Sequence, residues 1–383
     1  MSRMASRMSH AAGLLKASEI RRFSDLAAAT PGCISLTLGE PDAETPPEIC
    51  RRLKEAVIFK ETHYIPNAGV PALRQKVSES EKRRGLCYDP DEILMAAGAT
   101  EAIFVALAGI LNPGDEVIIP LPAFVLYEQI VRFLGGVPVF LKTRDSDFVP
   151  AASALADKIT LKTKAVILNS PNNPTGCVYS REALSEIEAV LHDRDIFVLC
   201  DEVYRDLCYE ETVAPSYTAV SDQKEKWLMV ESFSKSYAMT GWRVGYLMAD
   251  RSLMPRLTLI HQYLVTSMPS LFSRACETAL DTDLSEMRRA YRERRDYAYT
   301  RITQMGLSCA RPQGAFYLFF SIEKLAVTSA EFCRIAIEKA KVALTPGYCF
   351  GQEGFVRLSF SCSPEKLRLG LDRLETLIAT WEG

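Results

Sequence analysis

The chain has 383 residues, more than a single hydrophobic core supports, so a large domain and a smaller one are expected. Its composition is typical of a globular protein, and it contains no apolar run long enough to span a membrane. The net charge of −3 and the lack of a basic cluster argue against a nucleic-acid partner. We therefore expect a cytoplasmic protein that binds neither membranes nor nucleic acid.

The cysteines and histidines do not indicate a metal site. The eleven cysteines occur singly, without a CxxC pair or a secretory signal, and are expected to be reduced thiols. The four histidines, at positions 10, 63, 192 and 261, show no metal-ligand spacing, so no metal is expected. The residues before Ser18 are basic and serine-rich, and we interpret them as an N-terminal arm rather than a transit peptide.

Between about residues 90 and 250, short apolar runs alternate with helical stretches, which is typical of βαβ units around a mostly parallel sheet. The predicted strands are Glu116–Pro120, Val137–Leu141, Ala165–Asn169, Ile196–Cys200, Trp227–Val230 and Val244–Met248. The predicted helices are Thr100–Leu111, Phe124–Leu134 and Arg181–Leu191. Several of the strands are apolar without alternation, as in strands buried on both faces.

After about residue 280 the pattern changes to an α+β module. The predicted elements are the helix Leu284–Gln304, the strand Ala315–Ser321, the helix Ser329–Lys341, the strand Phe355–Ser361 and a helix from Pro364. No linker separates the two regions. We expect a large domain at residues 45–278 and a small domain made of residues 1–44 and 279–383, with a ligand in the cleft between them.

The segment SFSK at residues 232–235, followed by GWRVGY at 241–246, carries the most chemical information. By itself a lysine is usually a solvated surface residue. Here Ser232 and Ser234 offer hydroxyl donors, and Arg243 offers a planar fork that matches phosphate oxygens. Lys235 lies in a weakly charged stretch that favours a lowered amine pKa. This combination suits a phosphate-bearing aldehyde.

With four further motifs in the expected order, the chain resembles the fold type I aminotransferases of class I and II, which depend on pyridoxal 5′-phosphate (PLP), over nearly its whole length. The resemblance implies an α/β fold with a mostly parallel seven-stranded sheet between helices, plus a smaller α+β domain. It also implies that Lys235 holds PLP as a Schiff base and later moves the Cα proton of the substrate.

Two motifs follow predicted strands. The run NSPNNPTG at 169–176 would alone be a turn-rich loop, and Asp201 in DEVY could simply cap a helix. The resemblance places Asn173 beside the PLP phenolic oxygen and the substrate carboxylate. It assigns Asp201 to the pyridine nitrogen, which a buried carboxylate keeps protonated, and Tyr204 to the phenolic oxygen.

The motif AGATEA at 97–102 opens a helix, whose first N–H groups can bind an anion. The resemblance assigns Gly98, Ala99 and Thr100 to the PLP phosphate. It also assigns Phe124 to stacking on the PLP ring, although an aromatic residue at this position would otherwise be interpreted as core packing.

Arg357 lies in an otherwise apolar strand and must either pair with an anion or reach water. The resemblance makes its partner the α-carboxylate of the substrate, with the backbone of Gly39 in LGEPD close to the same group. Tyr64 in YIPNAG would alone be part of a surface turn. The resemblance implies that it donates to the PLP phosphate of a second subunit, so a homodimer with shared active sites is expected.

The expected function is the transfer of an amino group between an α-amino acid and a 2-oxo acid by a ping-pong mechanism. The alternative is a PLP-dependent C–S lyase or a related α,β-eliminating enzyme of the same fold. A PLP-binding transcription regulator would need an added DNA-binding module, for which the sequence leaves little room. No residue in the sequence identifies itself as a second carboxylate-binding arginine, so the substrate is left open.

Overall fold

The computed structural model describes residues 4, 7–211 and 213–381. A seven-stranded sheet forms the centre of its larger part, with the strand order β2-β8-β7-β6-β5-β3-β4. Strand β8 runs antiparallel to both of its neighbours, and the other pairings are parallel. The expected α/β class is therefore confirmed. The strands are β2 Ile93–Ala96, β3 Glu116–Leu121, β4 Val137–Lys142, β5 Thr163–Asn169, β6 Phe197–Asp201, β7 Trp227–Ser232 and β8 Gly245–Ala249.

The six strands predicted for this region are present, with ends that move by one or two residues. Strand β2 was not predicted, because its four buried apolar residues are too short a run to show a period. Strands β6 and β7 continue into Asp201 and Ser232 beyond the predicted ends. These polar residues stay in the strands because they take part in the ladder, where Asp201 pairs with Asn169 and Ser232 with Gly245.

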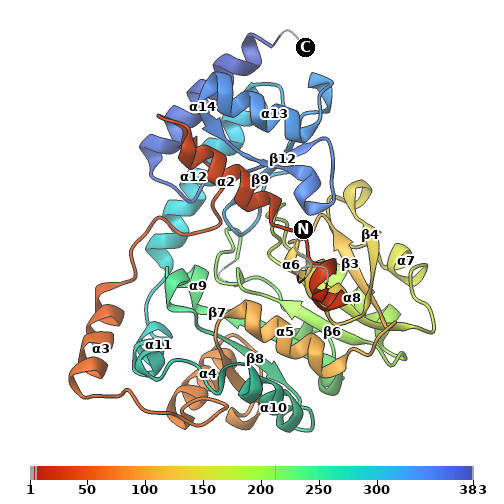
Figure 1. Cartoon of the computed structure of the whole chain (residues 1–383), viewed down its shortest axis with the longest axis vertical. Coiled ribbons are helices and arrows are strands. Elements are labelled where there is room, and N and C mark those ends of the chain that lie inside the picture. Colours follow the sequence, from red (N-terminus) through yellow and green to blue (C-terminus); the bar gives the residue numbers. More distant parts are fainter. Residues whose placement is uncertain (1–3, 5–6, 212, 382–383) are drawn as a thin grey trace.

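The helices between residues 47 and 279 lie around this sheet, as Figure 1 shows. Helix α5 lies against β7, β8 and α10. It begins at Ala99, directly after Gly98, which has a positive φ of 88°. The helices of this part are α3 Pro47–Ile58, α4 Pro71–Arg83, α5 Ala99–Ile110, α6 Leu126–Phe133, α7 Ala152–Ala156, α8 Arg181–Leu191, α9 Phe233–Ser236, α10 Met254–Val265 and α11 Ser273–Ala279.

A three-stranded antiparallel sheet, ordered β11-β12-β9, forms the centre of the smaller part at the top of Figure 1. Helix α2 (Glu19–Ala29) packs there, and β1 (Ile34–Ser35) pairs with β10 (Val342–Ala343). These contacts join the N-terminal segment to the C-terminal one, while the boundaries at residues 44 and 278 stay a prediction. The remaining elements are β9 Tyr317–Ser321, β11 Thr345–Pro346, β12 Phe355–Ser359, α12 Ser285–Gln304, α13 Ser329–Ile335 and α14 Pro364–Ala379.

Two local features differ from the expectations. The helix predicted over Ser329–Lys341 leaves α geometry at Ile335 and continues as a π-helical turn to Ala340, where Lys341 takes the left-handed conformation. The arm contains a short helix, α1 (His10–Leu14), which packs on α6. Residues 1–3 and 5–6 of the arm lie outside the described residues.

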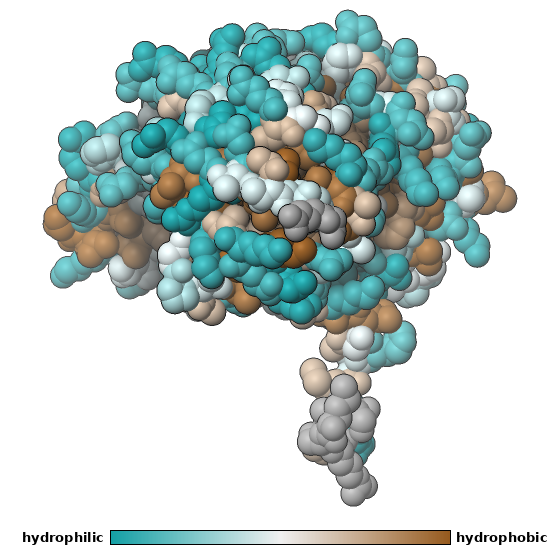
Figure 2. All heavy atoms as spheres, turned by 90° about the horizontal axis from the view of Figure 1, so that it is seen from above, coloured by the Kyte–Doolittle hydropathy of each residue, from teal (hydrophilic) through white to brown (hydrophobic). Residues whose placement is uncertain are grey.

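The surface view of Figure 2 shows a largely hydrophilic face, with hydrophobic side chains gathered at the left edge and more of them near the centre. Among the helices of the described residues, none is both long enough and apolar enough to cross a bilayer. All eleven cysteines are free thiols.

A buried cluster of charges lies close to the ends of β6 and β7. The guanidinium of Arg205, only 1% exposed, contacts Glu81 at 2.5 Å, Glu231 at 3.0 Å and Glu202 at 3.3 Å. Burial raises the pKa of Glu202 to about 7 and that of Glu231 well above its ordinary value, whereas Arg205 and Arg84 hold the pKa of Glu81 low despite its burial. Arg205 is therefore the cation that offsets the free-energy cost of burying these carboxylates.

Replacing Arg205 by methionine should lower the free energy of unfolding by about 3–5 kcal/mol, because the change leaves buried carboxylates without their cation. Denaturant unfolding followed by circular dichroism measures the change. The matched control is Arg334→Gln, which breaks a half-exposed pair with Glu338 and should cost about 0.5 kcal/mol or less. Similar losses in both variants would contradict this role for Arg205.

Candidate active site

A cavity of about 520 Å³ opens where the carboxyl ends of β5, β6 and β7 face helix α2 and strand β12. Ligands of α/β proteins commonly bind at this edge of the sheet. The cavity brings together twelve of the side chains and backbone positions predicted from sequence: Gly39, Ala99, Thr100, Phe124, Asn173, Asp201, Tyr204, Ser232, Ser234, Lys235, Arg243 and Arg357.

Two predicted residues do not line this cavity. Gly98 lies just beside it as the N-cap of α5. Tyr64 is on the surface with 90% of its side chain exposed, and it lines a different pocket beside α11. The chain therefore does not bring its own Tyr64 into the cavity.

Asn169 ties the strand ends to the loop that follows β5. Its Nδ2 donates to the backbone oxygen of Asp201 at 2.9 Å, and its Oδ1 accepts from the backbone N–H of Asn173 at 3.0 Å. Asn169 also lines the cavity, although it was not predicted as a site residue. Its place as the first residue of the NSPNNPTG motif and the last of a predicted strand was the available signal.

The carboxylate of Asp201 is buried and held by two donors. Its Oδ2 accepts from the Tyr127 hydroxyl at 2.6 Å, and its Oδ1 accepts from the backbone N–H of Val203 at 3.3 Å. Burial raises the pKa of Asp201, and the hydrogen bond from Tyr127 opposes this rise. Tyr127 was missed, although it stands three residues after Phe124, a spacing that places two helical residues on one face.

The amine of Lys235 faces the cavity and donates to the backbone oxygen of Gly39 at 2.6 Å. Burial lowers the pKa of Lys235 to about 8; the charge of Glu40 opposes this shift, and the charges of Arg243 and Arg357 add to it. At pH 7.5 about a quarter of such amines are neutral, against about 0.1% at an ordinary lysine pKa. A larger fraction of Lys235 than of an ordinary lysine is therefore neutral, which is the form in which an amine can act as a nucleophile.

An anion site lies at the beginning of α5. The first N–H groups of this helix have no intrahelical acceptor, and the hydroxyls of Ser232 and Ser234 and the guanidinium of Arg243 line the same end of the cavity. A Cβ at position 98 would lie 2.6 Å from the Arg243 Nη2. Glycine at this position therefore allows Arg243 to approach the helix N-terminus closely.

A second anion site is built around Arg357, which is 2% exposed. Its Nη1 donates to Asn173 Oδ1 at 2.8 Å and its Nη2 to the backbone oxygen of Thr37 at 2.6 Å. The guanidinium also lies over the ring of Tyr317. Within the described residues no carboxylate lies within 4 Å of Arg357, and its Nε has no partner. A buried cation without a counter-ion is unfavourable, so the surroundings of Arg357 favour an anionic ligand.

A pair of buried tyrosines lines the same cavity, and one of them lies against Arg357. The hydroxyls of Tyr204 and Tyr317 are 2.7 Å apart, and burial raises the pKa of both, so they remain neutral hydrogen-bonding groups. Tyr317 was not singled out from the sequence. It stands in the predicted strand Ala315–Ser321, and its function shows only once β9 is paired with β12, which carries Arg357.

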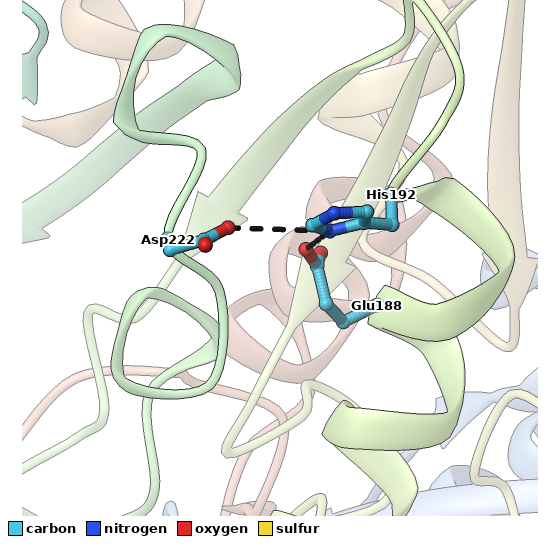
Figure 3. A group of neighbouring side chains, drawn as sticks. All are labelled: Glu188, His192 and Asp222. Carbon is cyan, nitrogen blue, oxygen red and sulfur yellow. Dashed lines mark hydrogen bonds and ion pairs between the residues drawn. The ribbon is translucent and has the colours of Figure 1, made fainter.

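A separate group of titratable side chains lies outside this cavity, at the end of α8 (Figure 3). His192 Nδ1 is 3.1 Å from Glu188 Oε1 and 4.0 Å from Asp222 Oδ1. The hydrogen bond with Glu188 raises the pKa of His192. Glu188 also accepts from Tyr217 and Ser221, so an imidazolium paired with carboxylates accounts for the arrangement. That no metal binds stays a prediction.

Comparisons with known proteins agree on one family. The family model described as "Aminotransferase class I and II" matches residues 31–374. The chain is 40% identical to a probable N-acetyl-LL-diaminopimelate aminotransferase of Bacillus subtilis, over 95% of this chain and 94% of that one. It is 38% identical to an aspartate aminotransferase of Pyrococcus abyssi, over 97% and 98%. The crystal structure of an aromatic aminotransferase from Pyrococcus horikoshii superposes with a TM-score of 0.88 at 36% identity, covering 93% of this chain and 98% of that one.

The lowered pKa of Lys235 can be tested by amine acetylation at a series of pH values, on protein freed of small ligands. The rate of modification of the Lys235 peptide, measured by mass spectrometry, should rise with pH and reach half its maximum near pH 8. Other lysine peptides of the same digest provide the reference. A midpoint above pH 10 for Lys235 would show that burial does not control its charge.

Proposed function

Because this chain belongs to the class I and II aminotransferases, we propose that it binds PLP through Lys235 and transfers an amino group between an α-amino acid and a 2-oxo acid. One observation supports this most directly. The same cavity holds the nucleophilic amine of Lys235 and the buried guanidinium of Arg357, which has no carboxylate partner among the described residues. A cavity that contains both a reactive amine and a cation suited to a carboxylate fits an α-amino acid as substrate.

The residues of the cavity fit PLP. The cationic Arg243, the hydroxyls of Ser232 and Ser234 and the α5 N-terminus, with Gly98, Ala99 and Thr100, match a phosphate dianion. The buried carboxylate of Asp201 would hold the pyridine nitrogen protonated, and Phe124 would stack on the ring. When bound, PLP supplies an aldehyde that condenses with amines and a ring that withdraws electrons from the substrate carbon.

The side chain of Arg357 would bind the substrate α-carboxylate with its planar fork, assisted by Asn173 and by the backbone of Gly39. Asn173 Oδ1 already accepts from Arg357, so its Nδ2 is left to donate to the substrate or to the cofactor phenolic oxygen. Tyr204, neutral and fixed by Tyr317, would donate to the same phenolic oxygen. The substrate Cα would thereby be held close to Lys235.

Lys235 would then move the proton. Its Nζ, which faces the cavity, would accept the Cα proton of the bound substrate and return it in the second half of the reaction. A general base works best when its pKa is near the working pH, and the pKa of about 8 meets this condition. A second 2-oxo acid would reverse the sequence, which gives ping-pong kinetics.

An eliminating enzyme of the same fold was the alternative. Each of the relatives named above is an aminotransferase, and they match this chain over more than nine tenths of its length. The transfer reaction is therefore favoured over elimination.

The functional unit is proposed to be a homodimer in which Tyr64 completes the phosphate site of the other subunit. Large apolar side chains are exposed at the end of α3, in the Tyr64 loop and at the end of α10. Hydrogen bonds from Asn67 to Thr266 and from Ser270 to Glu61 hold these segments together. An exposed patch of this kind suggests a protein interface, for which a second copy of the chain is the simplest occupant. The exposed residues are Val57, Ile58, Phe59, Tyr64, Tyr263, Leu264 and Val265.

Replacing Asp201 by asparagine should leave PLP bound but lower kcat by about 100-fold or more, because an amide cannot stabilise a protonated pyridine nitrogen. The measurement is the rate at which glutamate converts the cofactor from its aldehyde form to its amine form, followed by absorbance. The control is Tyr127→Phe, which removes one hydrogen bond to the carboxylate but keeps its charge, and should cost far less. Near-normal activity of Asp201→Asn would remove Asp201 from this role.

Shared sites can be tested by mixing Tyr64→Phe chains with Lys235→Ala chains. In a heterodimer with shared sites, one site carries both defects and the other carries neither. The intact site should bind PLP about 10-fold or more tightly than the sites of Tyr64→Phe homodimers, which lack one hydrogen bond to a charged acceptor. PLP titration followed by absorbance measures the difference, and sedimentation gives the oligomeric state. A fully active monomer, or unchanged PLP affinity without the hydroxyl, would contradict the shared site.

A further inference from the structure

A buried histidine on α10 contacts the first turn of α5, the helix whose N-terminus forms an anion site. His261 is 0% exposed, and its Nδ1 lies 3.0 Å from Oε1 of Glu101. Helix α10 packs against α5 (Figure 1). The other ring nitrogen, Nε2, is buried and has no hydrogen-bond partner among the described residues. Within that part of the chain, the contact with Glu101 is therefore the one polar contact of the ring.

Packing alone does not account for a histidine at position 261. A buried polar atom without a partner costs free energy, and an apolar side chain of similar size would avoid this cost. The hydrogen bond with Glu101 is the interaction that an apolar side chain could not make. Because a carboxylate only accepts hydrogen bonds, Nδ1 of His261 is the donor.

The carboxylate of Glu101 belongs to the same helical turn as the anion site, but it does not reach that site. Ala99 and Thr100 line the cavity, whereas Glu101, the next residue, does not. Its Oε2 accepts from the backbone N–H of Ala97 at 3.1 Å, so both carboxylate oxygens have donors outside the cavity. The N-terminus of a helix attracts acidic side chains for the same reason that it attracts phosphate. A carboxylate released in this turn would therefore compete with an anionic ligand.

We propose that His261 holds the Glu101 carboxylate away from the anion site, so that the first N–H groups of α5 stay open to a phosphate. This inference rests on the proposed binding of PLP and adds a positioning residue to it, because His261 does not line the cavity and acts through Glu101. Without the imidazole, Oε1 of Glu101 loses its donor. The nearest replacements are the N–H groups of the first turn and the hydroxyl of Thr100, which a phosphate would also use.

The test compares the binding of PLP with that of pyridoxal, which has the same aldehyde but no phosphate, on protein freed of cofactor. His261→Phe removes the donor and keeps a ring. It should weaken PLP binding by about 10-fold and change pyridoxal binding by less than about twofold, because only the phosphate competes with the carboxylate. Schiff-base absorbance measures both affinities. His261→Asn, whose amide nitrogen can replace Nδ1 as the donor, should bind PLP like the wild type.

Two further variants separate this role from damage to the fold. When Glu101→Gln is added to His261→Phe, the competing charge is gone, so PLP affinity should return to within about threefold of the wild type. The matched control is His192→Phe, because His192 also pairs with a glutamate, Glu188, but lies outside the cavity (Figure 3). This control should change neither affinity. A double variant no better than His261→Phe, or equal losses for PLP and pyridoxal, would overturn the inference.

Inorganic phosphate provides a second readout, which needs no Schiff base. Calorimetric titration of the cofactor-free protein with phosphate should show about 10-fold weaker binding in His261→Phe, and recovery when Glu101→Gln is added. If the wild-type chain forms no Schiff base with PLP, the proposed function fails, and the phosphate titration still decides the role of His261. Undiminished phosphate affinity in His261→Phe, or no phosphate binding by the wild type, would contradict that role.

Discussion

The register of the parallel strands determines which groups meet in the cavity. Asn169 at the end of β5 pairs directly with Asp201 at the end of β6, and β7 carries the chain two residues further to Ser232. Successive side chains of a strand point to opposite faces, so a slip of one residue in this ladder would turn Asp201 away from the cavity. A hydrogen bond from Asn169 Nδ2 to the backbone oxygen of Asp201 ties the two strand ends together in this register.

The alternation of side chains along a strand also separates the polar residues that line the cavity from the carboxylates that are buried in the interior. Asp201 and Ser232 face the cavity, where they are open to a ligand, whereas their chain neighbours Glu202 and Glu231 meet Arg205 in the interior. The Asp201 carboxylate, which lines the cavity, is thereby kept apart from the Glu202 and Glu231 carboxylates, which contact Arg205. In the DEVY motif, the two adjacent acidic residues thus have different surroundings: Asp201 lines the cavity, and Glu202 belongs to the buried charge cluster.

The sequence alone indicated most of the fold, because the strands of the sheet are apolar runs and each of the functional residues predicted on them stands at a strand end. The sequence alone could not indicate contacts between elements that are far apart along the chain. Tyr317 becomes a site residue only because β9 lies beside β12, and β2 was too short to show a period.

The buried cluster around Arg205 also couples folding to proton uptake at Glu202. The single guanidinium faces three carboxylates, of which Glu81 has a lowered pKa while the pKa values of Glu202, about 7, and of Glu231 lie above the ordinary 4.5. Between pH 4.5 and about 7, Glu202 therefore binds more protons in the native state than in the unfolded chain. The contribution of Glu202 to stability is present at the acidic end of this window and is lost as the pH rises through 7. At this residue, folding takes up protons from the solvent and unfolding releases them.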